Sequence, residues 1–286
     1  MGQTMQNMIE ISGFSFRYRE MEEPAIREAD LAIPAGAFVG VTGAAGSGKS
    51  TLTYAMNGIV PHCYPGDFYG SVVVDGMDVC ECALTDISRS VGSVCQDVES
   101  QFVTSVVEDE MLYGLENFGI AHEEIEQRVS AALEDMGITD LRDRVIASLS
   151  GGQKQKVAIA SILALAPKVL VLDEPTAELD PASSENVFML LARYARDHGT
   201  TVVVVEQKIA LLARYADMLV VMENGSIRFA DAPERVLSHD EELRRIGVNC
   251  PRATTLVNRM RAHGVASPGA VRTVDEACFV LEGVLA

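Results

Sequence analysis

The sequence predicts an α/β fold built around a mostly parallel β-sheet. Two continuous apolar runs, Val169–Asp173 and Val202–Val205, are typical of strands that are buried on both faces of such a sheet. A third apolar run, Phe38–Thr42, ends in a glycine-rich segment, and helical sequence follows it. The chain has 286 residues, 48% of them hydrophobic, so it is long enough for one large domain and a small appendage.

The other predicted elements are shorter, and turn residues mark their ends. Asn224-Gly225 is a strong hairpin turn between two of them. After Ala230 the pattern changes to short helical pieces broken by prolines, which indicates a C-terminal extension over residues 232–286. In chain order, we expect strands at Ile9–Tyr18 and Ile26–Ile33, a helix from Ser47 to Met56 that is stopped near Asn57-Gly58 and Pro61, a strand at Val72–Asp75, a mostly helical stretch over 106–166 that includes Glu123–Met136, and paired strands at Met218–Met222 and Ile227–Phe229.

The composition argues against several classes of protein. The formal net charge of −18 disfavours binding to nucleic acid, because phosphates are neutralised by clustered Lys and Arg. No run of 18 or more apolar residues occurs, and residues 1–10 lack the basic and apolar blocks of a signal peptide, so we expect neither a membrane span nor a leader. Cys80 and Cys82 form a lone CxC without the second pair of a zinc site, so we expect the six cysteines to be reduced thiols.

A phosphate-binding loop of the form GxxxxGKS follows the strand that ends at Thr42. Small residues allow its backbone amides to turn toward phosphate groups, and the N-terminus of the next helix adds positive charge. Lys49 can reach the β- and γ-phosphates, and the hydroxyl of Ser50 can bind magnesium. A chance glycine-rich turn is the alternative, which the strand before the loop and the helix after it disfavour. The residues predicted to contact the nucleotide here are Gly43, Ala44, Ala45, Gly46, Ser47, Gly48, Lys49, Ser50 and Thr51.

Two carboxylates, Asp173 and Glu174, end the apolar strand that begins at Val169. Ligands of an open parallel sheet bind at this carboxyl edge. Asp173 is therefore predicted to hold magnesium, and Glu174 is predicted to polarise the water that attacks the γ-phosphate. The alternative is that the two carboxylates merely end a strand and cap a helix. The phosphate-binding loop elsewhere in the same predicted sheet favours the catalytic interpretation.

The segment Leu149–Gln153, continued by Lys154–Ala160, resembles the signature sequence of the ATP-binding-cassette (ABC) ATPases. The resemblance covers about the first 230 residues and implies ATP hydrolysis coupled to transport, with ATP and Mg²⁺ as cofactors. It implies a P-loop NTPase core over residues 1–231, with an antiparallel β subdomain and a helical signature subdomain at about 97–166. In this family the signature binds the γ-phosphate of ATP held by an opposite subunit, which implies a dimer. The matching residues are Ser150, Gly151, Gly152 and Gln153.

Three further positions match the ABC family in order. Tyr18 lies where an aromatic residue stacks on adenine, although a tyrosine in a strand can be merely structural. Gln96 matches the glutamine that senses the metal and the attacking water and that links the ATPase to its membrane partner. Glu178-Leu179-Asp180 resembles the loop that crosses to the other subunit.

A narrower resemblance is to the energy-coupling-factor importers of vitamins and transition-metal ions. In those ATPases a second glutamine, here Gln101, opens a short helix beside the groove that grips a transmembrane coupling protein. The implied partners are a second ATPase subunit (identical or different), this coupling protein and a substrate-binding membrane protein that chooses the cargo. The chain would lie on the cytoplasmic face of the membrane. The matching segments are Asn57–His62, Gln96–Phe102, Val107–Glu110, Tyr113–Asn117 and, in the extension, Asn249–Leu256, Gly264 and Thr273–Ala277, which resemble a C-terminal dimerisation module.

One position departs from the family pattern. Most ABC ATPases carry a histidine after the strand equivalent to Val202–Val205, and counting back from Tyr215–Asp217 places Gln207 there. A glutamine amide can donate a hydrogen bond to a phosphate, but it cannot become charged or shuttle a proton. Two interpretations stay open. Gln207 is either a tolerated substitution or the mark of a weakened site in an asymmetric heterodimer.

Two other functions compete with transport. A soluble cassette protein that acts on DNA or ribosomes usually has two cassettes or a long coiled-coil insertion, whereas this chain has one cassette and no heptad run. A catalytically poor regulatory subunit is suggested only by Gln207. The presence of Lys49, Asp173 and Glu174 argues against a complete loss of activity.

Overall fold

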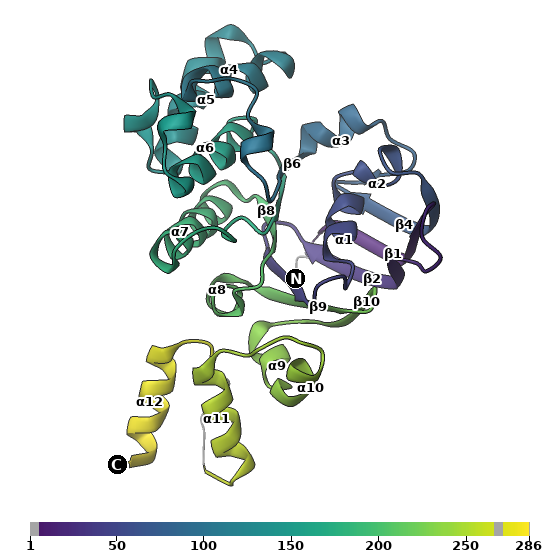
Figure 1. Ribbon diagram of the computed structural model, residues 1–286, viewed down its shortest axis with the longest axis vertical. Helices are drawn as coiled ribbons and strands as arrows, with labels where there is room; N and C mark the ends of the chain where they lie inside the picture. Colours follow the sequence, from purple (N-terminus) through teal and green to yellow (C-terminus); the bar gives the residue numbers. More distant parts are fainter. Residues whose placement is uncertain (1–5, 266–270, 286) are drawn as a thin grey trace, which may run out of the picture.

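The computed structural model describes residues 6–265 and 271–285, and a six-stranded β-sheet forms its centre (Figure 1). Its strands run parallel except for β10, which pairs antiparallel with β9 at one edge. The sheet confirms the predicted mostly parallel α/β fold. In spatial order its strands are β10 (Ser226–Asp231), β9 (Met218–Glu223), β3 (Phe38–Gly43), β8 (Thr201–Val205), β7 (Val169–Asp173) and β6 (Val91–Val94).

The central strands divide their side chains between two hydrophobic clusters on opposite faces of the sheet. In β8, Val202 and Val204 belong to the cluster that contains the large helices, whereas Val203 and Val205 belong to the other. All four valines are 0% exposed. A strand that is buried on both faces needs an uninterrupted apolar sequence. This is why continuous runs, rather than alternating patterns, marked these strands in the sequence.

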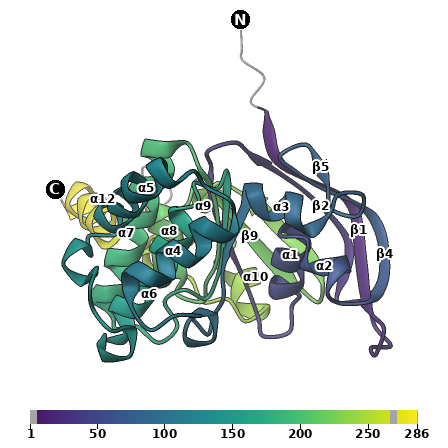
Figure 2. The same ribbon diagram turned by 90° about the horizontal axis from the view of Figure 1, so that it is seen from above.

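A second, antiparallel sheet packs against one face of the central sheet (Figure 2). Its order is β2 (Ile26–Pro34), β1 (Asn7–Tyr18), β4 (Gly66–Val74) and β5 (Met77–Asp78), and the helices on this side are α1 (Lys49–Met56), α2 (Ile59–His62) and α3 (Leu84–Ser90). One expectation was wrong in detail. Strand β4 begins at Gly66 rather than Val72, because its first half pairs with β1 while most of its side chains stay exposed. The predicted helix ends at Met56 as expected, and Pro61 lies in the separate short helix α2.

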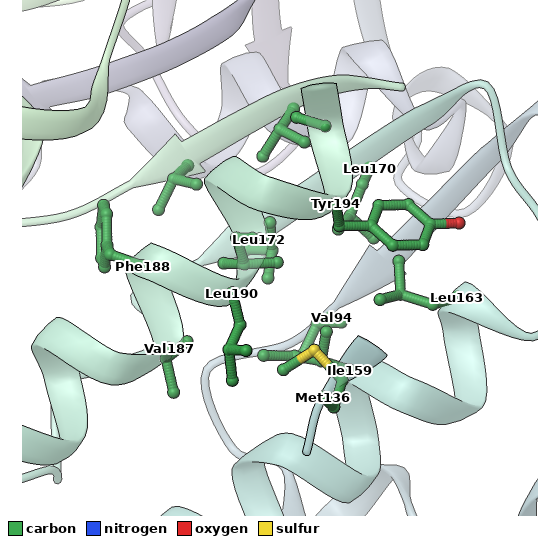
Figure 3. Packing of buried hydrophobic residues seen from close by; sticks show 14 of the residues in the cluster. Val94, Met136, Ile159, Leu163, Leu170, Leu172, Val187, Phe188, Leu190 and Tyr194 are labelled. Carbon is green, nitrogen blue, oxygen red and sulfur yellow. The ribbon is translucent and has the colours of Figure 1, made fainter. Parts of the chain in front are cut away.

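The large helices cover the other face of the central sheet. Figure 3 shows Phe188 and Leu190 of α7 (Pro181–His198) beside Leu172 of β7, and Ile159 of α6 (Gly151–Leu163) in the same cluster. The group α4–α6 lies at one end of the molecule (Figure 1), and its core is continuous with that of the sheet. Its other elements are α4 (Val107–Asn117), α5 (His122–Asp135), which begins one residue before the predicted helix, and the 3₁₀ turns η1 (Glu99–Gln101), η2 (Thr139–Leu141) and η3 (Ile146–Ser148).

The C-terminal helices lie at the opposite end from α4–α6 (Figure 1). They are α9 (Pro233–Leu237), α10 (Asp240–Arg245), α11 (Arg252–Ala262) and α12 (Val274–Leu285), whereas the preceding helix α8 (Ile209–Tyr215) packs on the central sheet. The pair α11–α12 shares a small core of its own and exposes large apolar side chains, of which Phe279 is 74% exposed. No helix in the described part of the chain is both long and apolar enough to cross a bilayer. The six cysteines are free thiols in the structure.

Candidate functional site

The glycine-rich loop joins β3 to α1 at the carboxyl edge of the central sheet. Gly48 has φ +100°, and a Cβ there would lie 2.6 Å from the carbonyl oxygen of Ala25, so only glycine fits. The ammonium group of Lys49 donates to the carbonyl oxygens of Gly43 at 3.0 Å and Ala44 at 2.9 Å. The lysine is 8% exposed and is therefore held across the loop rather than extended into solvent.

The charged groups around this loop are poorly solvated. Burial lowers the pKa of Lys49, and the charges of Glu174 and Asp173 only partly oppose that shift. Burial also raises the pKa of Asp173, against the lowering effects of the Ser50 hydroxyl and the Lys49 ammonium. In addition, the Ser47 hydroxyl is buried without a hydrogen-bond partner. A ligand that brings both anionic oxygens and a cation would compensate these groups.

Glu174 lies at the point where three neighbouring strands end. It follows β7, and its backbone adopts φ +49°, a left-handed conformation that is uncommon outside glycine. Gln207, which follows β8, donates from Nε2 to one carboxylate oxygen of Glu174 at 2.6 Å. Gln96, which follows β6, donates to the other oxygen at 3.4 Å. The structure therefore brings these three predicted residues together, with the carboxylate held between two amides.

Two cavities meet at this edge of the sheet. One, of about 250 Å³, lies between α1 and β6, and Ser50, Asp173 and Gln96 line it. The other, of about 340 Å³, is lined by Gln96, Glu174, Gly151 of the signature segment and Leu179 among others. Gln96 borders both cavities, so it stands between the predicted metal-binding side and the segment that carries Leu179.

Tyr18 ends strand β1 beside the glycine-rich loop. Its hydroxyl lies 3.0 Å from Oγ1 of Thr51 in α1, which links the antiparallel sheet to a residue that is predicted to contact the nucleotide. Burial raises the pKa of the Tyr18 phenol, and the hydrogen bond with Thr51 partly offsets this shift. The ring is half-buried and presents a flat surface next to the loop.

The signature segment forms the start of α6 and is well ordered by its own residues. Ser150 is the N-cap, and its Oγ accepts from the backbone N–H of Gln153 at 3.4 Å. The Oε1 of Gln153 accepts in return from the N–H of Ser150 at 3.0 Å, which completes a capping box. Gly151 and Gly152 form the first turn of the helix. Among the described residues, no hydrogen bond joins 150–153 to the loop 43–51.

The segment after Gln96 differs from its expected form. We expected Gln101 to open a short helix, but η1 spans Glu99–Gln101 and Gln101 closes it. The Oε1 of Gln101 accepts from the backbone N–H of Cys95 at 3.2 Å and so folds the segment back on the end of β6. The carboxylate of Glu99 meets the ammonium of Lys154 in α6 at 2.5 Å. An ion pair thus joins this segment to the signature helix.

A polar network beneath Gln207 was not predicted from the sequence. Glu206 is 2% exposed and accepts from the hydroxyl of Thr176 and from the N–H groups of Gln207 at 2.8 Å and Lys208 at 3.1 Å. The Lys208 ammonium donates to the carbonyl oxygens of Thr176 at 2.5 Å and Leu179 at 3.0 Å, and to Ser184 Oγ at 2.8 Å. The signal was present: two charged residues flank Gln207 directly after a strand of buried valines.

Comparison with known proteins decides the family. The profile described as ABC transporter matches residues 26–177, which is more than half of the chain. The chain belongs to the ABC transporter ATPases. A protein of Pyrococcus horikoshii that is named for an ABC transporter ATP-binding role is 39% identical to this ABC ATPase over 276 residues, which cover 96% of the chain and 97% of the relative.

Other relatives agree with this family. The energy-coupling factor transporter ATP-binding protein EcfA2 of Caldanaerobacter subterraneus subsp. tengcongensis is 36% identical over 275 residues, 94% of each chain. The solved structure of CbiO1 from Clostridium perfringens, described as part of the ABC transporter complex CbiONQ, superposes with a TM-score of 0.76 at 29% identity. It covers 90% of this ABC ATPase and 99% of CbiO1.

A bacterial ABC transporter cassette solved as a dimer gives a TM-score of 0.68 at 25% identity, over 79% of this chain and 99% of that cassette. Together these relatives show that the protein binds ATP and hydrolyses it to drive transport.

Proposed function

We propose that this ABC ATPase powers an energy-coupling-factor type importer, which takes up a vitamin or a transition-metal ion through separate membrane subunits. The observation that carries the proposal is the full-length similarity to EcfA2, together with the likeness to a subunit of the CbiONQ complex. The segment Gln96–Phe102, with its second glutamine, supports the same assignment. Cargo choice would then belong to a substrate-binding membrane protein, so vitamin and metal cargo both remain compatible with this chain.

The loop and its neighbours would hold the nucleotide. Lys49 and the backbone amides from Ala44 to Thr51 would bind the phosphates. A Cβ at Gly43 or Gly48 would clash with a backbone carbonyl oxygen, so this loop conformation requires glycine at both positions. Tyr18 would stack on the adenine. Ser50, Asp173 and Gln96 fit Mg²⁺, because they bring hydroxyl, carboxylate and amide oxygens to one cavity, and this hard donor set suits that ion. When bound, Mg²⁺ would neutralise the charge that develops on the β- and γ-phosphate oxygens.

Hydrolysis would depend on the position of Glu174. Its carboxylate would orient the attacking water and draw its proton, and the amides of Gln96 and Gln207 would fix the carboxylate in place. A neutral amide fixes the carboxylate without changing its own charge at any working pH. Gln207 would thus help to orient the carboxylate of Glu174. Unlike the histidine that most of the family carries at this position, it could not become charged or transfer a proton.

The working unit would be a dimer of two ATPase subunits, identical or different. The signature residues Ser150–Gln153 make no hydrogen bond with this chain's own loop in the part of the chain that the structure describes, which suits a role toward the nucleotide of a partner. Residues 1–231 would form the nucleotide-binding domain, with a helical subdomain at about 97–166. Residues 232–286 would form a dimerisation module, since α11 and α12 expose Leu256, Val274 and Phe279.

The chain would lie at the cytoplasmic face of the membrane through contacts with a coupling protein. Purification of the tagged chain from detergent-solubilised membranes of its own host tests the proposal. We expect co-purification of a polytopic membrane protein in stoichiometric amount, with ATPase activity that rises when its cargo is added. Association with ribosomes or DNA, and with no membrane protein, would contradict the proposal. A Lys49→Ala variant, which we expect to lose ATP affinity, separates assembly from nucleotide binding in the same preparation.

A further inference from the structure

Three tyrosines from separate segments stack beside the glycine-rich loop. The ring of Tyr64, in the turn after α2, lies edge-on to Tyr18, with centroids 5.8 Å apart and an interplanar angle of 80°. The other side of the stack is Tyr54 of α1, whose ring is nearly parallel to that of Tyr64 at 18° and 5.7 Å. Both arrangements are favourable for aromatic pairs. Tyr64 therefore bridges the end of β1 and the helix that follows the loop.

This stack constrains the orientation of Tyr18 from two directions. The hydroxyl of Tyr18 is tied to Thr51 at 3.0 Å, while its ring is flanked by Tyr64 and, at 4.9 Å and 85°, by Phe16 of the same strand. Phe16 is fully buried, so it anchors the ring from the core side. Tyr64 is 44% exposed, so its ring provides the wall on the solvent side.

Core packing does not account for the place of Tyr64. A side chain that is nearly half exposed contributes little to the hydrophobic clusters, and yet its ring is held between two other rings. Tyr69 of β4 provides the contrast. It is 65% exposed, and within the described residues its ring stacks on no other aromatic side chain. The comparison separates an ordinary surface tyrosine from one that is built into a stack.

We propose that Tyr64 is a positioning residue for nucleobase binding, which holds the ring of Tyr18 at the angle needed to stack on a purine. The inference rests on the proposed stacking role of Tyr18. Without Tyr64, the Tyr18 hydroxyl keeps its hydrogen bond with Thr51, but the ring gains freedom to turn about its Cβ–Cγ bond. Ordering it again on binding then costs conformational entropy, and this cost affects the base and not the phosphates.

The test compares a triphosphate ligand that carries a nucleoside with one that does not. Dissociation constants for MgATP and for magnesium tripolyphosphate are measured by calorimetry on Tyr64→Leu, Tyr64→Phe and the matched surface control Tyr69→Leu. We expect Tyr64→Leu to weaken MgATP binding by about two- to tenfold, which corresponds to the free energy of one aromatic pair. Tripolyphosphate binding should stay unchanged. Tyr64→Phe keeps the ring and should bind both ligands as the wild type does, as should Tyr69→Leu.

Two results would overturn the inference: unchanged MgATP affinity in Tyr64→Leu, or an equal loss for both ligands, which would indicate general damage to the loop. A Tyr18→Leu variant separates this failure from that of the proposed platform. If Tyr18→Leu weakens MgATP selectively and Tyr64→Leu does not, only the role of Tyr64 is wrong. If Tyr18→Leu itself shows no selective loss, the stacking role of Tyr18 is wrong, and the inference about Tyr64 is overturned with it.

Discussion

The side-chain amide of Gln207 donates a hydrogen bond of 2.6 Å to the carboxylate of Glu174, across the ends of two neighbouring parallel strands. Gln96 approaches the second carboxylate oxygen from the strand on the other side. The carboxylate is thus oriented before any ligand arrives. Preorganised groups of this kind lower an activation barrier because little rearrangement accompanies the reaction.

Replacing Glu174 by Gln should preserve ATP binding and stall hydrolysis. The substitution keeps the size of the side chain but removes its ability to accept a proton from water, and it replaces one of the two oxygens that accept from Gln96 and Gln207 by an amide donor. We expect turnover to fall by about 10²- to 10⁴-fold with little change in MgATP affinity, and the closed dimer to accumulate on size-exclusion chromatography. Glu134→Gln is the control, since Glu134 is an exposed residue of α5 far along the chain from the site. Normal turnover in Glu174→Gln would show that another group polarises the water.

Replacing Gln207 by His tests whether the glutamine weakens this site. If Gln207 marks the slower half of an asymmetric dimer, the histidine variant of the assembled complex should turn over ATP faster. The gain should require a pH at which the imidazole can exchange its proton, near its ordinary pKa of about 6.5. The measurement is steady-state phosphate release against pH, with Gln207→Ala as the variant that only removes the contact with Glu174. An unchanged rate in Gln207→His would leave a tolerated substitution as the explanation.

Replacing Asp173 by Asn should stabilise the nucleotide-free protein at neutral pH. Burial raises the pKa of Asp173, so its proton is bound more tightly in the folded than in the unfolded state. The stability that this provides is present at low pH and is lost as the pH rises through the folded-state pKa, which leaves a costly ionised carboxylate at pH 7.5. Thermal unfolding should therefore give a higher Tm for Asp173→Asn at pH 7.5, and the difference should shrink below about pH 4.

MgATP should raise the Tm of the same Asp173→Asn variant less than it raises the Tm of the wild type. Wild-type protein should rise in Tm as MgATP is added, because a ligand that binds only the folded state stabilises it by mass action. The variant lacks the carboxylate that is proposed to hold Mg²⁺, so its Tm should respond weakly. A lower Tm for nucleotide-free Asp173→Asn would contradict the view that the site is prepared for its ligand at a cost in stability.

Replacing Lys208 by Met should destabilise the fold. Its ammonium joins Thr176, Leu179 and Ser184, and the variant would leave partly buried carbonyl oxygens without a donor. We expect a loss of about 2–4 kcal/mol in the free energy of unfolding, measured by denaturant titration. Lys168→Met is the control, because Lys168 makes an exposed ion pair with Asp75 and should cost no more than about 1 kcal/mol. Equal losses in both variants would mean that the network beneath Gln207 contributes no more to the free energy of unfolding than an exposed ion pair does.

Reversing the ion pair between Glu99 and Lys154 should affect coupling more than stability. The pair is partly exposed, with side chains 69% and 17% accessible, so its contribution to folding should stay within about 1 kcal/mol. It nevertheless ties the segment after Gln96 to the signature helix. In the reconstituted complex, Lys154→Glu should reduce the stimulation of ATPase activity by cargo, and the double variant Glu99→Lys/Lys154→Glu should restore part of it. Failure of the double variant to restore any stimulation would show that the charges do not act as a pair.

Sequence patterns predicted the parts of this fold in which local chemistry is decisive. The continuous valines of β8 predicted a strand buried on both faces, and the glycines around Lys49 predicted a tight loop before a helix. The first half of β4 was missed because its stability comes from pairing with β1 and leaves no apolar pattern. Such pairing depends on residues about 50 positions away in the chain, as in Phe16 opposite Phe68.

In the candidate site, too, local motifs could be predicted and long-range contacts could not. Lys49, Ser50, Asp173 and Glu174 were identified because each lies in a short motif with a defined chemistry. The polar network beneath Gln207 and the stack of tyrosines could not be found in this way, since their residues meet only after the strands are in register. Gln101 was assigned to the wrong end of its helical turn because boundaries of such short elements have no strong sequence signal.

The capping box of α6 has a consequence for how this surface can change. The oxygen of Ser150 already accepts a bond from its own helix, but a hydroxyl also has one hydrogen to give. In the proposed dimer, the same atom would therefore complete the helix with its lone pair and donate its hydrogen to a phosphate bound by the partner subunit. An alanine at this position would fray the first turn and remove that donor in a single step. A substitution at Ser150 would then affect both the helix of its own chain and the nucleotide site of the partner.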